Sequence, residues 1–493
     1  MKITKYLAVL CGVLFLSSCH EEFLTEKVYS SMTPLNFYQT EDDATAALTS
    51  VYNAMIAQNG WGRQIWLSGE YPGEAAWPNN SGEAFRTELD QYTWTTSSTG
   101  FPQIWGQLYV MINRANTVLK YIDQAEFETS GLKDQIVGET KFLRGLAYLY
   151  LIRFFDHIPC MTEENMQEEY PTNVDTDDAV WNLIIADFTY AKSVLKPKNT
   201  GANIGRATSG AAQAMLVKAY TTLGGKPWNK SEYWAMAATE AKEIMNNSQY
   251  GYGLESDYKN VFALANEHGK EYVFSLECES KIGLGRDFPT FTGIRNGDQT
   301  KLGGWSSLTA TVSFFNSMAA TDKRRDKTFV ISYYGYANPT QLYTYPGNIS
   351  LPHFNKFIDM TDINATGTAD YAMNLPICRY ADVLLMQSEA ENEANGPSSN
   401  AVEGINIVRD RAGLTPLNPG DYSKATLRDA ILQERAWEFC EEGQAYFDLK
   451  RMDGIIKRIT PLGFAPSEKH YVFPIPQAEM DVNPNLVQNE AYK

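Results

Sequence analysis

Segments in which apolar residues recur every three or four positions alternate along this chain with segments that show no such pattern. Because that spacing places apolar side chains on one face of a helix, it predicts helices over 40–56, 101–121, 133–155, 177–195, 209–223, 231–245, 380–395, 401–412 and 424–452. Thr40 precedes three acidic residues, which is typical of an N-cap followed by a first helical turn. The chain is therefore predicted to be mainly helical.

Two neighbouring predicted helices, 209–223 and 231–245, have the composition of a closely packed pair. Ala and Gly lie next to Tyr and Leu in them, and a Gly-Gly-Lys-Pro turn separates them. Such pairs resemble those of tetratricopeptide (TPR) repeats, although generic helical packing stays an alternative because the match to the full repeat is loose. We expect an all-α fold, a TPR-like superhelical scaffold of helix pairs with long loop excursions and few short strands.

Two long segments, 57–100 and 246–375, have a different character. Gly, Asn, Thr, Tyr or Trp are frequent in them, and helical periodicity is scarce except around 308–318. We expect loops with short strands in both segments. Since binding residues concentrate on loops that a rigid scaffold positions, these segments are where a ligand site is expected.

The N-terminus has the pattern of a secretory signal. Lys2 and Lys5 precede an apolar run over 6–16, which is too short to span a bilayer as a helix. The run ends in Leu-Ser-Ser-Cys19, an order that resembles a bacterial lipobox and implies cleavage before Cys19 and its acylation. An ordinary signal peptide with an incidental Cys19 is the alternative. We expect a lipoprotein signal peptide over 1–18, a lipidated tether over 19–39 and a single domain over 40–493.

Charge and cysteine usage exclude several classes of function. The formal charge of −17 argues against nucleic acid and anionic lipid as partners, because both need a basic surface. Four cysteines beyond the signal are far apart, so no zinc site is indicated, and one disulfide stays open. These are Cys160, Cys278, Cys378 and Cys440. The five histidines show no ligand spacing, and nucleotide-binding and nucleophile motifs are missing. We expect no metal and no cofactor.

Two loops have the composition of a sugar-binding surface, in which flat aromatic rings meet amides and a few charges. The first, 69–82, offers Tyr71, Trp77, Asn79 and Asn80 among Gly and Pro residues. The second candidate offers Arg295 and Trp305. The alternative is that each tryptophan anchors its own loop against the core, since large aromatic residues are highly buried on average. Trp105, Trp181 and Trp437 lie on helical faces and are assigned to the core.

The segment from Glu434 to Asp448 is rich in carboxylates and could suggest an acid and a base of an enzyme. Glu434 and Glu438 lie one helical turn apart with Arg435 beside them, however. Charges at this spacing usually form ion pairs or a solvated face. We favour that interpretation and expect no enzymatic activity.

Five sequence blocks, taken together, resemble the SusD/RagB family of outer-membrane lipoproteins of Bacteroidetes. They are Lys141–Tyr148 with His157–Pro159, Arg379–Ala390, Ile405–Leu414, Glu434–Arg451 and Pro474–Asn489. The resemblance covers essentially the whole chain after the signal. His20-Glu21-Glu22 also resembles the surface-export signal of such lipoproteins. Ala445 and Met452 depart from the family pattern, where Arg and Trp are common.

The resemblance implies a function at the cell surface. It implies an all-α, TPR-containing protein on the outer face of the outer membrane that captures a glycan. The protein would then deliver the glycan to a SusC-type TonB-dependent transporter and act as its lid. A peptide carrier of the same architecture is the first alternative. A lid that binds no ligand itself is another, and a surface glycoside hydrolase is less favoured.

Overall fold

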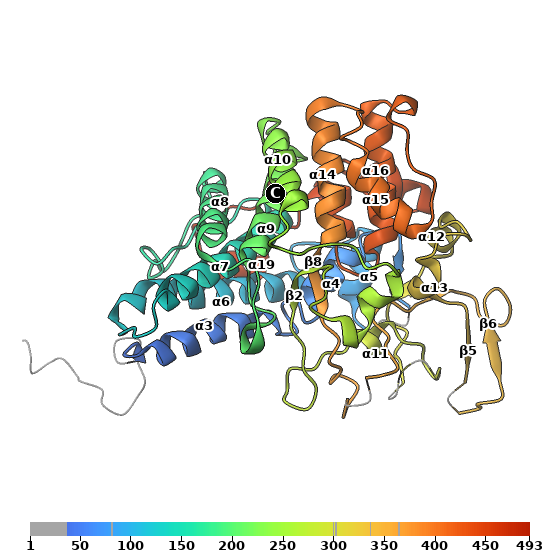
Figure 1. The fold of residues 1–493 in the computed structure, drawn as a ribbon, viewed down its shortest axis with the longest axis horizontal. Coiled ribbons are helices and arrows are strands. Elements are labelled where there is room, and N and C mark those ends of the chain that lie inside the picture. The colour runs from blue at the N-terminus through green and yellow to red at the C-terminus, as the bar shows by residue number, and fades with distance from the viewer. Residues whose placement is uncertain (1–36, 80–81, 299, 301–302, 336, 363–364) are drawn as a thin grey trace, which may run out of the picture.

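The structure is a computed structural model that describes residues 37–493 except 80–81, 299, 301–302, 336 and 363–364 (Figure 1). The expected signal peptide, Cys19 and Asn80 lie outside the described residues.

Most helices begin and end within two residues of the positions that the apolar periodicity predicts. They are α3 (Glu41–Met55), α6 (Gly100–Tyr121), α7 (Leu132–Phe155), α8 (Asp177–Val194), α9 (Ser209–Gly224), α10 (Glu232–Asn246), α14 (Tyr380–Asn395) and α15 (Glu403–Ala412). Thr40 caps α3 as expected: its hydroxyl accepts the Asp43 N–H, and the Asp43 carboxylate accepts the Thr40 N–H at 2.9 Å.

Helices that follow one another in the chain pack against one another in space. Contacts run from α3 to α6 and α7, then through α8, α9 and α10 to α14, which in turn contacts α15 and α16 (Lys424–Phe439) (Figure 1). Close approach requires small residues, because a Cβ on Gly224 would lie 2.5 Å from the Trp234 ring. The TPR-like helical scaffold predicted from sequence is confirmed.

The predicted helix over 424–452 is wrong, because the chain forms two helices, α16 and α17 (Ala445–Arg451). Glu441 and Gly443, in the break between them, have left-handed backbone angles, with φ of 67° and 69°. The break is stabilised by α4 (Gln64–Glu70), which is distant in sequence. The Trp66 indole donates to the Glu441 carbonyl at 2.5 Å, and the Glu70 carboxylate accepts the N–H groups of Glu441 and Gly443 at 2.9 and 3.0 Å.

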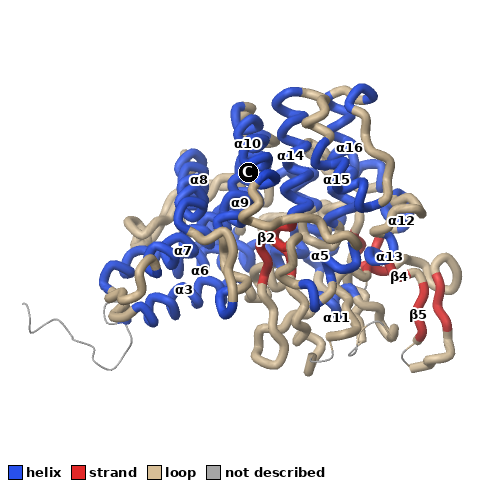
Figure 2. The backbone as a smooth tube through the Cα atoms, viewed as in Figure 1, coloured by secondary structure: helices blue, strands red, loops and turns tan. Residues whose placement is uncertain are grey.

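The two loop-rich segments contain more regular structure than predicted. Besides α4, they form short helices α5 (Ala84–Gln91), α11 (Phe288–Thr292), α12 (Val312–Ser317) and α13 (Arg325–Thr328). The strands form antiparallel pairs (Figure 2): β1 (Ala76–Trp77) with β3 (Thr309–Ala310), β2 (Tyr272–Leu276) with β8 (Leu375–Arg379), β4 (Phe329–Val330) with β7 (His353–Phe354), and β5 (Ser332–Tyr334) with β6 (Leu342–Thr344). Few, short strands are as expected.

The C-terminal segment, which includes α18 (Ile455–Ile459) and α19 (Gln477–Val482), returns to the helical scaffold. The Phe473 N–H donates to the Phe154 carbonyl at 2.8 Å, and the two rings stack at 5.1 Å. The helical scaffold and the C-terminal segment therefore share one core.

Candidate ligand-binding site

One tryptophan of the segment 57–100 is exposed, whereas its neighbours are buried. Trp61, Trp66 and Trp94 are 1–2% exposed, and Trp66 packs edge-on against Phe288. Trp77 is 40% exposed. Core anchoring thus accounts for the other three rings but leaves the Trp77 ring available to a ligand.

The structure joins the first candidate loop to the residues that directly follow the second. Strand β1 pairs with β3 so that Trp77 lies opposite Thr309, and the Tyr71 hydroxyl donates to the Ser307 carbonyl at 2.9 Å. Asn79, which is half-buried, donates its backbone N–H to the Trp77 carbonyl at 2.9 Å and closes a tight turn. The first candidate loop is thereby fixed to the chain that follows Trp305.

Tyr71 does not have the position expected of a ligand contact. Its side chain is fully buried, and burial raises the pKa of its hydroxyl well above the ordinary value. The sequence pattern could not separate Tyr71 from Trp77, because both lie in the same Gly- and Pro-rich loop. Tyr71 instead positions the loop through its hydrogen bond to Ser307.

The second candidate loop is hydrogen-bonded back onto α11. The N–H of Trp305 donates to the Thr290 carbonyl at 2.7 Å, and the N–H of Ser306 donates to the Gly293 carbonyl at 2.8 Å. Trp305 is half-buried, with its ring edge-on to Phe291 at 6.1 Å. Arg295 is exposed, and its guanidinium donates to the Trp305 carbonyl at 3.3 Å. This arrangement leaves part of the indole and an adjacent cation at the surface.

The base of the Trp77 loop is anchored by Glu70 on the break between α16 and α17. Burial raises the pKa of Glu70 to about 7, although the N–H groups of Glu441 and Gly443 oppose that shift. A Cβ on Gly69 would lie 2.0 Å from the Gly443 carbonyl oxygen, so the two backbones touch here. The position of the loop thus depends on the helical scaffold.

The sequence interpretation missed an aromatic hairpin, formed by β5 and β6, which projects from the molecule in Figure 1. Tyr333 and Tyr343 stack across the hairpin at 5.1 Å, while Tyr334 and Leu342 are exposed on the other face. Tyrosines at alternating positions around Pro339 were the available signal.

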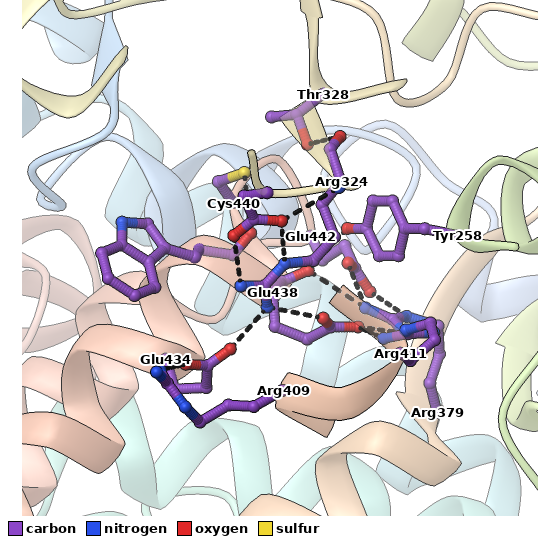
Figure 3. A network of polar contacts seen from close by, with 12 residues as sticks. Tyr258, Arg324, Thr328, Arg379, Arg409, Arg411, Glu434, Glu438, Cys440 and Glu442 are labelled. Carbon is purple, nitrogen blue, oxygen red and sulfur yellow. Dashed lines mark hydrogen bonds and ion pairs between the residues drawn. The ribbon is translucent and has the colours of Figure 1, made fainter. Parts of the chain in front are cut away.

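The carboxylates of the Glu-rich segment form a buried network of ion pairs (Figure 3). Glu438 contacts Arg379 at 3.0 Å, Arg411 at 2.5 Å and Arg324 at 3.0 Å. Burial alone would raise the pKa of Glu438, but these guanidinium groups hold it well below its usual range. Glu434 pairs with Arg324 at 2.8 Å.

The burial of this network argues against Glu434 and Glu438 as the acid and base of an enzyme. Glu434 and Glu438 are 1% and 0% exposed, so neither carboxylate can reach a polysaccharide. The ion-pair interpretation is confirmed, but the charges form a buried cluster and no solvated face. Trp105 and Trp181 are buried as expected, whereas Trp437 is half-buried and donates to the Ser317 hydroxyl at 3.0 Å.

Cysteines and potential metal ligands give no further site within the described residues. Cys160, Cys278, Cys378 and Cys440 are free thiols, so the open question of a disulfide is answered for these four. No cluster of His, Cys, Asp and Glu in the described part of the chain could hold a metal ion. Among the same residues, no helix is both long and apolar enough to cross a membrane.

Comparison with known families identifies the class of this protein. The model of the SusD family matches residues 198–462, more than half of the chain. A second model, described as "Starch-binding associating with outer membrane", matches residues 22–221. The chain therefore belongs to the SusD family, as the sequence blocks implied. SusD-family proteins are known as non-catalytic glycan-binding proteins, which agrees with the expectation that this chain is not an enzyme.

Relatives match along nearly the whole chain. A SusD-like protein of Formosa agariphila is 27% identical over 503 residues, with 97% of each chain covered. A SusD-like protein of Bacteroides ovatus is 25% identical, covering 90% of this chain and 82% of its own length.

Solved structures share the fold. A SusD homologue from Bacteroides thetaiotaomicron has a TM-score of 0.80 at 22% identity, over 95% of this chain and 99% of its own. A laminarin-binding SusD-like protein has a TM-score of 0.77 at 25% identity, over 92% and 100%. Surface glycan-binding protein A from Bacteroides thetaiotaomicron, in complex with laminarihexaose, has a TM-score of 0.75 at 20% identity, over 92% and 100%.

Proposed function

We propose that this protein captures a glycan at the cell surface and delivers it to a SusC-type TonB-dependent transporter, for which it serves as the lid. The observation that carries the proposal is the exposed ring of Trp77, held by β1 on a loop that is fixed to the helical scaffold. Flat aromatic faces bind the C–H faces of sugar rings, and rigid placement lowers the entropic cost of binding. Two structural neighbours are a laminarin-binding protein and a laminarihexaose complex, which supports a glycan as the cargo class.

The proposed contacts lie on both candidate loops. Trp77 and Trp305 would stack against sugar rings, while Asn79, Asn80 and Arg295 would hydrogen-bond to hydroxyl groups at the rims. Tyr71 is assigned to positioning because it is buried.

Calorimetric titration of the purified full chain in a nonionic detergent tests the cargo class. The panel contains neutral and acidic oligosaccharides, with peptides alongside. Saturable heat with one class of glycan is expected. If only the peptides give heat, the protein is a peptide carrier and the glycan proposal is wrong. If no member of the panel gives heat, a lid that binds no ligand is favoured.

The anchor and the partner need separate tests. We propose that Cys19 carries the acyl chains that hold the protein on the outer membrane. Labelled palmitate should be incorporated into the wild-type chain and not into Cys19→Ala, and incorporation into both would contradict the assignment.

Affinity purification from solubilised outer membranes should recover a TonB-dependent transporter with the wild-type protein. Recovery of the protein without a transporter would contradict the proposed complex.

A further inference from the structure

A second cleft lies outside the two candidate loops. Three segments line it: 197–208 before α9, 250–252 after α10, and 268–275, which enters β2. The cleft contains about 910 Å³, part of it open to solvent. This volume is within the range of small-molecule sites, about 300–1,000 Å³. None of its lining residues belongs to the proposed glycan contacts around Trp77 and Trp305.

Basic side chains line this cleft, namely Lys198, Arg206, His268 and Lys270. Carboxylate oxygens of Glu277 and Glu255 lie against two of its glycines, 2.8 Å from a Cβ on Gly205 and 3.3 Å from one on Gly269. The protein as a whole has a formal charge of −17. Four other cavities in the described residues all include carboxylates, namely Glu70, Glu74 and Asp448; Glu169 and Glu479; Glu243 and Glu391; Asp257 and Asp326.

Two of the four basic groups already pair with a carboxylate. The Arg206 guanidinium pairs with the Glu139 carboxylate at 2.8 Å, and His268 pairs with Glu277 at 3.2 Å. Within the described part of the chain, no carboxylate lies within 4 Å of the ammonium groups of Lys198 and Lys270, although the Glu255 carboxylate lies near Gly269 in the same wall. These two charges are therefore available to an anionic ligand.

The backbone leaves room for the Lys198 ammonium group in the cleft. A Cβ on Gly251 would lie 2.1 Å from Lys198 Nζ, and Gly251 has a left-handed φ of 64° that favours glycine. The Lys270 carbonyl accepts the Gly253 N–H at 3.0 Å, which ties its segment to the same turn. The Asn199 amide donates to the carbonyls of Arg206 and Ala207 at 3.0 and 3.2 Å and fixes the opposite segment.

Aromatic side chains complete the cleft. The rings of Tyr250 and Tyr252 lie 5.6 Å apart, and Tyr252 is half-buried. A partly apolar wall beside two ammonium groups that form no ion pair suits a sugar ring that carries an anionic substituent. Lysine binds carboxylate, sulfate and phosphate groups as a point charge.

We propose that this cleft binds the anionic substituent of an acidic glycan, either the carboxylate of a uronic acid or a sulfate ester. The inference rests on the proposed function in that it takes the cargo to be a glycan. It makes acidic polysaccharides the preferred class and gives them a second contact, separate from the aromatic surface around Trp77.

The test uses calorimetry on the purified full chain with five probes: a galacturonate trisaccharide, a sulfated galactose trisaccharide, the neutral galactose trisaccharide, inorganic sulfate and an oligoglutamate peptide. The double variant Lys198→Gln/Lys270→Gln removes both free charges. Lys196→Gln is the matched control, since Lys196 is exposed two residues before Lys198 but does not line the cleft.

At least one acidic trisaccharide is expected to bind more tightly than the neutral one, and more weakly as salt is added. The double variant should lower that affinity about tenfold, which corresponds to about 1.4 kcal/mol, because it removes two exposed ion pairs with the ligand. Lys196→Gln should leave it unchanged. Preference for the carboxylated or the sulfated probe identifies the source of the anion.

Four outcomes would overturn the inference. They are equal affinity for acidic and neutral sugars, an unchanged affinity in the double variant, an equal loss in Lys196→Gln, and inorganic sulfate or the peptide binding as tightly as the acidic sugars. Neutral sugars that bind through Trp77 without any acidic preference would overturn this inference alone. Failure of every sugar to bind would overturn the proposed function as well.

Discussion

The helical scaffold and the loop-rich segments share buried ion pairs but differ in the aromatic rings that they expose. Glu438 of α16 pairs in the core with Arg379 at the end of β8 and with Arg324, which precedes α13. The loop-rich segments bury most of their aromatic rings but leave Trp77 at the surface. We infer that buried contacts fix the positions of the loops, whereas the exposed Trp77 ring is free to contact a ligand.

The largest expected effect is on the buried network. Arg379→Ala should lower the free energy of unfolding by about 5 kcal/mol, because it leaves the carboxylates of Glu271, Glu438 and Glu442 short of a partner in the core. Denaturant unfolding measures the effect. Lys457→Ala, which removes an exposed pair with Asp429, is the control and should cost less than about 1 kcal/mol. Similar losses in both variants would mean that the buried network stabilises the fold no more than an exposed ion pair does.

A slightly smaller loss is expected where a loop-rich segment meets the scaffold. Trp66→Ala should cost about 4 kcal/mol, because its ring packs against Phe288 and Phe291 and its N–H donates to Glu441. Thermal unfolding should show a clearly lowered Tm. A Tm equal to that of the wild type would mean that the α4 contact does not stabilise the break between α16 and α17.

The contact at Glu70 predicts a pH dependence of stability. Its pKa rises from 4.5 to about 7 on folding. The folded state therefore binds this proton more tightly, so the contribution is fully present below pH 4.5 and is lost as the pH rises through 7. Relative to Glu70→Gln, the wild type should lose about 3 kcal/mol of stability across that window. Urea unfolding at several pH values measures the difference. A difference that stays constant or grows with pH would contradict the raised pKa.

The sequence predicted the scaffold well and the joining of distant segments poorly. Helix bounds such as those of α14 follow from local periodicity, which each segment contains by itself. The break at Glu441 was missed because Glu70, 371 residues away, supplies the carboxylate that stabilises it. The candidate site was predicted by composition, but only the structure separates the exposed Trp77 from the buried Tyr71.

The cleft that contains Lys198 and Lys270 could not be predicted from the sequence for the same reason. Lys198 and Lys270 lie in separate loops, and neither has an unusual sequence environment. Their shared cleft depends on how the segment before α9 packs against the segment before β2.

The most direct test of the central claim is a paired measurement of glycan affinity and unfolding free energy for Trp77→Ala, with Tyr170→Ala as the control because Tyr170 is equally exposed, at 41%. We expect Trp77→Ala to weaken binding of the oligosaccharide found by calorimetry about fivefold, near the lower end of aromatic stacking energies. Its unfolding free energy should stay within about 0.5 kcal/mol of the wild type, and Tyr170→Ala should change neither quantity. Unchanged affinity in Trp77→Ala, or a stability loss as large as that of Trp66→Ala, would contradict the account.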